Sequence, residues 1–582
     1  MGSEKFPKEN EFDQFIKNRN GFDNAMTECE HTVFYFKIGN EHLAGALDRF
    51  SQFFISPLML VESMEREMKA VESEFQNDAN NDVYRINQIF ASMVIDDHPA
   101  ANFTWGNLKT LKHEIRSDQL HQTVHEFCRK FYKSNRMNLC IQSSLSLDEQ
   151  QDMVVKYFSE IKPEYGTIFK NLSVDPFVDV FKVEFHKKMF YVKSKAKKRK
   201  LFMTFLMPSI ETDYQNKSLE YLAYLFGYEG RQSLNAYLKK NSLAHHITAK
   251  IGARSFEGNS MFTLFTIEIS LTREGLEDLH SVLDAIFAYL FIIKMTPIEE
   301  HKEIYGEFRE IRETLMRYRQ EKSAIENVQE LAVNMKYFND FDVIIGRELC
   351  PEFDAKIMKR MIDKINDSRF NLMILSDEYP KYDKIEKWFG TEYAEVNFPT
   401  KLANLWNERW IRKEFSLPWK NRFICRNFEL VSDLEENFHD EPVMILKNEF
   451  CKSFFKCDRK FQLPYGFVHI HFISTFTEAS VTNLNMTSIF SMCVKNYLSD
   501  KLHSASNAGY IYKLNSVEDG LTLKLNGFNE KLPLMVDIIV KALRNTDAVV
   551  DKVTFDVFKK ELRKNCYNVI INSNMFNEYV HI

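Results

Sequence analysis

Arg369-Phe-Asn-Leu-Met-Ile-Leu-Ser376 is the stretch that says most about how this 582-residue chain folds. Its apolar residues form a strand pattern, and the earlier stretch Arg136-Met-Asn-Leu-Cys-Ile-Gln-Ser143 has the same R-x-N-L start and the same pattern. A short polar segment and then an aromatic-rich, helix-like segment follow each of them, at residues 153–161 and 383–391. This repeat predicts two successive α/β-sandwich domains of one fold, in a protein of the α+β class.

The chain is too long for a single hydrophobic core, so we expect three domains. The polar residues 162–175 are typical of a linker, and a third unit with strand-like stretches at 468–474 and 520–528 begins near residue 420. The expected boundaries are 1–168 for the first domain, 169–405 for a second, homologous domain and 415–582 for part of a third.

Composition and charge exclude several classes of protein. The net charge of -6 gives no electrostatic reason to expect nucleic acid as a partner. No apolar run reaches the length of a membrane span, and the N-terminus has no signal-peptide core, so we expect no membrane partner. The nine cysteines are scattered and form no C-x-x-C motif, which favours reduced thiols and a cytoplasmic location.

Two glutamates on one predicted helical stretch, residues 61–93, form the first candidate site. Glu67 and Glu74 are seven residues apart, close to two helical turns, so both carboxylates lie on one helix face. That face borders an apolar stripe, and partly buried carboxylates need a metal, another cation or a shared proton. The alternative is an ordinary solvated, salt-bridged helix surface, because glutamate is common there.

Seven blocks of sequence follow one another in an order found in a known family. They are MGSEKFPKENEFDQFIKNRNGFDNAMTECEHTVFYF (1–36), ALDRFSQFFISPLM (46–59), REMKAVESEF (66–75), FTWGNLKTLK (103–112), EKWFGTEY (386–393), LPWKNRFICRNF (417–428) and KLNGFNEKLPLM (524–535). They resemble the pitrilysin–insulysin–nardilysin family of zinc metallopeptidases over essentially the whole chain. Details such as MGSEKFP and SDKLHSASNAGYIYKL (499–514) are more similar to the nardilysin branch.

This resemblance implies a zinc site built from two histidines and one glutamate. The family's motif is H-x-x-E-H, whose own glutamate acts as general base, and the ligand glutamate follows about 76 residues later. Glu74 matches the metal ligand, and Glu67 matches an upstream glutamate that helps to orient the catalytic site.

Counting back places the second histidine about four residues before Met1, so the first domain is expected to lack its N-terminal part and its zinc motif. No substitute motif occurs within the chain: His121 and His125 are four apart, but no glutamate stands in the required place between them. We therefore expect zinc in the complete family enzyme and not in this chain, which would then be inactive by itself.

The resemblance also implies substrate-binding residues. Asn24 and Ala25 match a strand edge to which the substrate backbone adds as an extra strand, although a turn asparagine near Gly21 is the alternative reading. Gly227, Glu229 and Gly230 match a glycine-containing stretch near the family's substrate-anchoring site. The last glycine of that pattern is Gln232 here, which puts close backbone approach at this edge in doubt.

Two functions follow from these patterns. One is a zinc metalloendopeptidase that encloses short peptides and prefers basic cleavage sites, of which this chain would be an incomplete piece. The other is a non-catalytic, peptide-binding paralogue. The expected partners are peptides, not nucleic acid or membranes, and the formation of homo-oligomers is left open.

Overall fold

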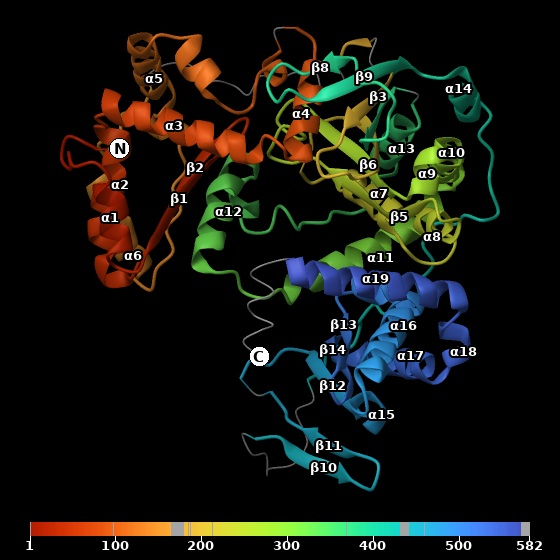
Figure 1. The fold of residues 1–582 in the computed structure, drawn as a ribbon. Helices are drawn as coiled ribbons and strands as arrows, with labels where there is room; N and C mark the ends of the chain where they lie inside the picture. The colour runs from red at the N-terminus through yellow and green to blue at the C-terminus, as the bar shows by residue number, and fades with distance from the viewer. Residues whose placement is uncertain are drawn as a thin grey trace. The chain divides into compact units, whose positions relative to one another are not determined.

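The computed structural model describes residues 2–571 except 97, 165–179, 184–185, 187, 212–213, 368, 431–440 and 459 (Figure 1). The chain forms two compact units that are interleaved along the sequence. Unit 1 comprises Met1–Gly227, Leu238–Thr296 and Gln320–Lys413, and unit 2 comprises Tyr228–Tyr237, Pro297–Arg319 and Glu414–Ile582. The division into domains at 1–168, 169–405 and 415–582 stays a prediction.

A seven-stranded mixed sheet forms the centre of unit 1, in the order β5-β6-β4-β7-β3-β9-β8. Strand β7, Phe370–Ser376, is parallel to β3 and antiparallel to β4, and all seven of its residues are buried. Burial on both faces explains its unbroken apolar run. The other strands are β3 (Lys188–Lys193), β4 (Lys200–Met207), β5 (Ala244–Ile251), β6 (Thr263–Leu271), β8 (Lys384–Ile385) and β9 (Glu392–Asn397).

Helices cover both faces of this sheet, which makes the predicted sandwich. Helix α4, Asp82–Ser92, packs Ile89 and Phe90 into a cluster with Met373 and Leu375 of β7. Phe370 of the same strand instead contacts Phe287 of α10, Leu279–Met295. The remaining helices of this part are α7 (Ser218–Gly227), α9 (Arg273–Glu277), α12 (Ala324–Tyr337), α13 (Ala355–Ile365) and α14 (Thr400–Asn407).

The N-terminal part of unit 1 has a core made mainly of phenylalanine. The hairpin of β1, Phe22–Thr27, and β2, Thr32–Lys37, lies beside helices in this part (Figure 1). Phe12 and Phe50 are buried between these elements and contact Phe36 edge-on at 5.6 and 5.1 Å between ring centroids. The helices are α1 (Glu11–Lys17), α2 (Leu43–Ile55), α3 (Val61–Asp78), α5 (Ser117–Phe131) and α6 (Leu147–Phe158).

A buried ion pair ties α4 to the main sheet. Arg85 donates to Asp82 at 2.6 Å and to the backbone oxygen of Lys193 at 2.9 Å, and Ser194 donates to Asp82 at 2.8 Å. Arg85 is almost fully buried, so removal of Asp82 would leave an uncompensated buried charge. The pair therefore holds the start of α4 against the end of β3.

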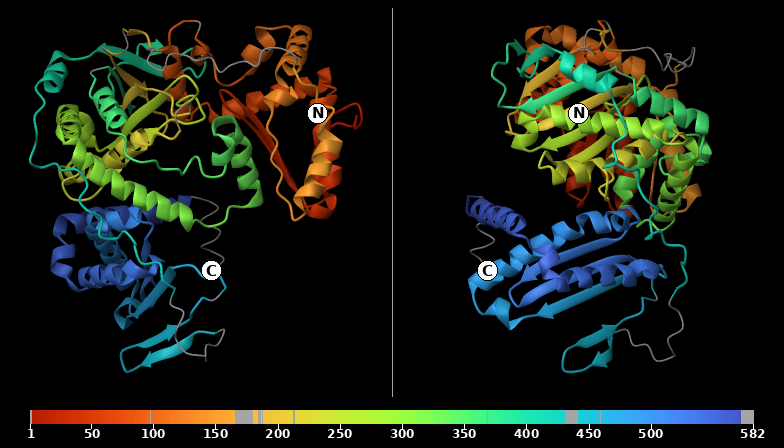
Figure 2. Two further views of the ribbon diagram at one scale, coloured as in Figure 1. Left: turned by 180° about the vertical axis from the view of Figure 1, so that it is seen from behind. Right: turned by 90° about the vertical axis from the view of Figure 1, so that its right-hand side faces the viewer.

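Unit 2 is built on a three-stranded antiparallel sheet in the order β12-β14-β13. Its strands are β12 (Tyr465–Ile473), β13 (Ile511–Val517) and β14 (Gly520–Phe528). Helices α16, Val481–Asn507, and α17, Leu532–Arg544, lie against this sheet (Figure 2). The other helices of this unit are α11 (Ile298–Arg317), α15 (Thr475–Glu478), α18 (Thr546–Val549) and α19 (Lys552–Ile571). The unit also contains a hairpin of β10 (Val443–Lys447) and β11 (Lys452–Phe455). Helix α8 (Leu234–Lys240) begins in unit 2 and ends in unit 1.

Two local predictions are wrong. Residues 137–143 form no strand, because their backbone pairs with none of the described strands. Residues 383–391 are not helical: they form the short strand β8 and a turn. The predicted stretch 61–93 is divided at 79–81, where the Asn81 side chain accepts the Val83 N–H and caps α4.

No single described helix is both long and apolar enough to cross a membrane, although α10 and α11 taken together pass that test by length and composition.

Candidate functional site

Helix α3 carries both predicted site glutamates. Apolar residues recur along it at helical spacing, and Met68 and Phe75 are 4% and 5% exposed. Glu67 and Glu74, each one position before a buried residue, are both exposed. Of the two interpretations of this helix face, the exposure of both carboxylates agrees with the solvated surface and not with partial burial.

Neither Glu67 nor Glu74 accepts a hydrogen bond or forms an ion pair with any residue that the structure describes. Glu72 on the same helix differs, because its carboxylate accepts the backbone N–H of Leu108 at 2.7 Å and the amide of Gln76 at 2.7 Å. Glu72 thus anchors α3 to the following loop. Glu67 and Glu74 remain available to a cation from outside the described residues.

An aromatic cluster holds the same helix from its buried side. The Phe75 ring lies 5.8 Å from Phe103, 6.4 Å from Trp105 and 5.1 Å from Phe389, and Phe103 stacks on Trp388 at 4.6 Å. Such ring pairs stabilise the folded state beyond what the burial of their apolar area contributes. Because Phe75 is the next residue after Glu74, this cluster fixes the position of the predicted ligand.

Glu386 shapes the turn that supplies Trp388 and Phe389. Its carboxylate accepts the backbone N–H groups of these two residues at 2.8 and 2.7 Å, and burial raises its pKa above the usual range. The sequence analysis missed this turn because the aromatic run of residues 383–391 looked helical. The signal that pointed to it was Gly390, which has a φ of +61°.

The β1 edge holds the predicted substrate-binding pair. Asn24 and Ala25 lie opposite Tyr35 and Phe34 of β2, and both are exposed. The Asn24 side chain accepts the Ala25 N–H at 2.8 Å. In the described part of the chain β1 pairs only with β2, so its other edge presents backbone groups to which an extended peptide can add.

Charged groups gather where this hairpin meets the rest of unit 1. The Glu30 carboxylate accepts the Ser260 N–H at 3.1 Å and lies 3.5 Å from the Lys336 ammonium. Burial, with Glu30 nearby, raises the pKa of Glu211 to about 7, although Arg254 donates its backbone N–H to this carboxylate. Burial next to Lys336 and Arg254 lowers the pKa of His31 to about 4.

Gly227 ends α7 in unit 1, and Glu229 and Gly230 belong to unit 2. A Cβ atom on Gly230 would lie 2.2 Å from the Tyr228 hydroxyl, so any larger residue here would require the Tyr228 side chain to move. Gln232 replaces the family's last glycine yet has a φ of +59°, the left-handed conformation that glycine favours. This position therefore has a backbone conformation that suits glycine, although glutamine occupies it.

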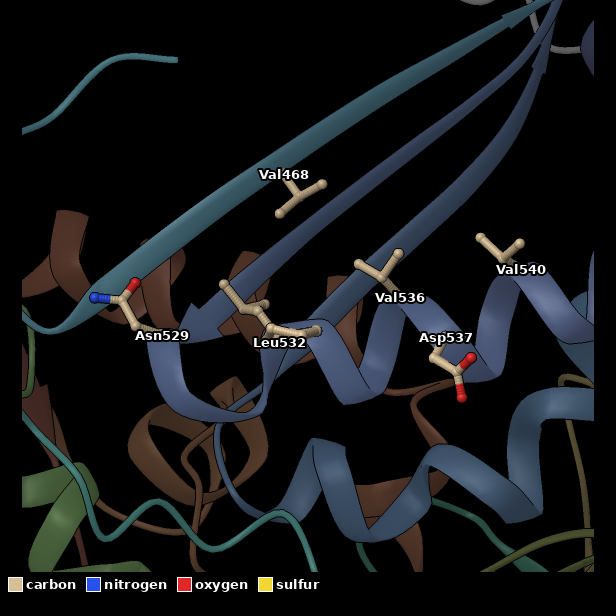
Figure 3. A pocket seen from close by; sticks show the side chains of 7 residues that line it. Val468, Asn529, Leu532, Val536, Asp537 and Val540 are labelled. Carbon is tan, nitrogen blue, oxygen red and sulfur yellow. The ribbon is translucent and has the colours of Figure 1, made fainter. Parts of the chain in front are cut away.

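Unit 2 also contains a shallow apolar groove between β12 and α17 (Figure 3). Its lining has two polar residues, Asn529 and Asp537, among Val468, Leu532, Pro533, Val536 and Val540. The Asp537 carboxylate also pairs with Lys541 at 2.7 Å. The groove holds no cluster of groups that would support catalysis.

A catalytic zinc ion needs three protein ligands, and the residues present do not fit that requirement. Among the described residues, no group of three histidine, cysteine, aspartate or glutamate side chains is placed to hold a metal. Glu74, with Glu67 nearby on the same helix, can supply one ligand. No catalytic step through zinc is therefore assigned to the residues that the structure describes.

Comparison with known proteins gives matches along the whole chain. Residues 1–98 match the family model of insulinase (peptidase family M16), residues 120–302 the peptidase M16 inactive domain, and residues 316–579 the middle or third domain of peptidase M16.

Full-length relatives and a solved structure agree with these matches. The chain is 33% identical to nardilysin of Homo sapiens over 98% of its own length and 49% of that protein, and 30% identical to insulin-degrading enzyme of Homo sapiens over 98% and 55%. The crystal structure of pitrilysin superposes with a TM-score of 0.79 at 22% identity, covering 98% of this chain and 59% of that one.

This chain thus spans about half the length of the curated relatives it matches. The pitrilysin comparison confirms the expected fold, and the three domain models follow one another in order. The chain belongs to the M16 peptidases, the pitrilysin–insulysin–nardilysin family.

Proposed function

We propose that this chain is part of a zinc metalloendopeptidase that cleaves short peptides, with a preference for basic sites. The observation that carries the proposal is the match of residues 1–98, which include α3, to the family model of insulinase (peptidase family M16). Glu72 is used to hold the helix, whereas Glu67 and Glu74 are exposed and have no described partner. In this proposal Glu74 is the carboxylate ligand of the zinc, Glu67 helps to orient the site, and the two histidines come from outside residues 1–582.

The substrate would bind along β1. Asn24 and Ala25 are exposed on the strand. Gly227, Glu229 and Gly230 are proposed as further substrate-binding residues, because their stretch of sequence resembles the family's substrate-anchoring segment. All nine cysteines are free thiols, which supports a cytoplasmic setting.

The test uses the protein encoded by the complete reading frame around residues 1–582. We expect an H-x-x-E-H motif a few residues before Met1, one zinc per protein by elemental analysis, and cleavage of a fluorogenic peptide with paired basic residues. Glu74→Gln should lose most of the zinc and the activity. The matched control is Glu65→Gln, since Glu65 is an exposed glutamate on the same helix. A reading frame without the motif, or full zinc content in Glu74→Gln, would contradict the proposal.

A second candidate, a peptide-binding protein without catalysis, is favoured by one observation: the open β1 edge lies entirely within this chain. In that case residues 1–582 alone would bind a labelled short peptide, as measured by fluorescence anisotropy. Asn24→Ala would weaken this binding, and the reading frame would carry no zinc motif.

A further inference from the structure

His121 and His125 face each other on α5, one helical turn apart. Their ring centroids are 4.5 Å apart, and their Nε2 atoms are separated by 3.2 Å. Both side chains are half-buried, so solvent still reaches the pair. The two imidazole nitrogens therefore converge on one point beside the helix.

The separation of these nitrogens suits a metal ion. Two bonds of about 2.1 Å from a zinc ion to nitrogens 3.2 Å apart would enclose an angle of about 100°. That angle lies between the right angle of octahedral sites and the tetrahedral angle of most zinc sites. The pair can thus act as a two-nitrogen chelate with little movement of either ring.

A backbone oxygen borders one of the two histidines and is a candidate third ligand. The backbone oxygen of Met59 is 2.9 Å from His121 Nε2. Met59 has a φ of +45°, which is uncommon for a residue other than glycine, and it lies two residues before the start of α3. The strained backbone thus presents a carbonyl oxygen to the histidine pair.

Metals bind the neutral form of imidazole. Burial lowers the pKa of His125, and His121 and Arg129 act in the same direction. On the same helix, Glu126 accepts a hydrogen bond from Gln122 at 2.8 Å. Water can complete the coordination shell from the solvent side.

We propose that His121, His125 and the Met59 carbonyl form a binding site for a borderline divalent transition metal such as Zn²⁺ or Cu²⁺. The site uses residues other than Glu67 and Glu74 and does not depend on the proposed peptidase activity. A bound ion would link α5 to the segment that leads into α3. Imidazole ligands select this class of metal over Mg²⁺ and Ca²⁺.

The experiment is calorimetric titration of the metal-free chain of residues 1–582 with ZnCl₂ and, separately, with CuCl₂. We expect a saturable site for one ion, with Cu²⁺ bound more tightly than Zn²⁺. His121→Gln and His125→Gln should each weaken binding by at least about tenfold, the lower limit of what loss of an outer partner costs a metal site. The double variant should lose little more than either single one, because both remove the same chelate.

Controls separate this site from general histidine binding. His113→Gln, which removes an exposed imidazole, and Glu126→Gln, which removes a carboxylate next to His125, should bind as the parent chain does. His125→Gln decides the matter if His121→Gln fails to fold, since only His121 bonds to Met59. The spectrum of bound Cu²⁺ in electron paramagnetic resonance should show two nitrogen ligands. Unchanged affinity in a folded His125→Gln variant would overturn the proposal.

Discussion

A single residue, Glu211, near the tip residue Glu30 of the β1–β2 hairpin, makes stability depend on pH. Glu211 has a pKa of about 7 in the folded protein, above the 4.5 of an unperturbed glutamate, because it is buried near Glu30. The folded state therefore holds this proton more tightly than the unfolded state does. The resulting stability is fully present below pH 4.5 and is lost as the pH rises to about 7.

Glu211→Gln should remove this pH dependence. Glutamine stays neutral and keeps an oxygen to accept the Arg254 N–H. Relative to the parent, the variant should gain stability progressively between pH 4.5 and 7 and then level off. The gain at pH 8 should be on the order of 1–2 kcal/mol, reduced from the full shift because the carboxyl is partly solvated. Urea unfolding at several pH values measures it, and a difference independent of pH would contradict the assignment.

At the scale of elements, α3 shows how much of the candidate site the sequence could predict. The helical period placed Glu67 and Glu74 on one face, and the family resemblance singled out Glu74. Their exposure and the different role of Glu72 depend on tertiary contacts with Leu108, which no local pattern contains.

Strands were predictable where period and length agreed, as in β7, β12 and β14. The failures lie at 137–143 and 383–391, where apolar and aromatic residues fit a strand or helix pattern equally well. In residues 383–391 the Glu386 carboxylate accepts two backbone N–H groups that would bond to backbone oxygens in a helix. These bonds stabilise the turn instead of the predicted helix.

Loss of the buried Phe75 ring should loosen α3. Phe75→Ala is expected to lower the free energy of unfolding by about 3–5 kcal/mol, because it leaves a cavity among Phe103, Trp105 and Phe389. Hydrogen exchange in Val61–Asp78 should become faster. Phe341→Ala is the matched control: Phe341 is 96% exposed, so its change should be within about 0.5 kcal/mol. Equal effects of the two substitutions would refute the role of the cluster.

On the scale of the whole molecule, the two compact units are interleaved along the sequence, so each unit is completed by segments that are far apart in the chain. Tyr318, just after α11, contacts Phe428 at 5.1 Å and Phe528 at 5.6 Å between ring centroids, and its backbone oxygen accepts the Tyr465 hydroxyl. A segment from the middle of the sequence thus completes the core of unit 2.

Tyr318→Ala should therefore destabilise unit 2 selectively, by roughly 2–4 kcal/mol. Hydrogen exchange measured by mass spectrometry should accelerate in β12 and β14 and stay unchanged in β4 and β7, because compact units open separately. Tyr567→Ala, at a 63% exposed tyrosine in α19, should leave both sets of strands unaffected. Faster exchange in β7 as well would show that the units unfold together.

The same interleaving has a consequence for synthesis on the ribosome. Helix α11 is translated roughly 150 residues before β12, which at about 5–20 residues per second means a wait of about 10–30 seconds. During that interval Leu315 and Tyr318, which pack against the unit 2 core in the finished protein, have no sheet to cover them. These two side chains at the end of α11 and just after it thus stay uncovered by unit 2 throughout the synthesis of the intervening segment.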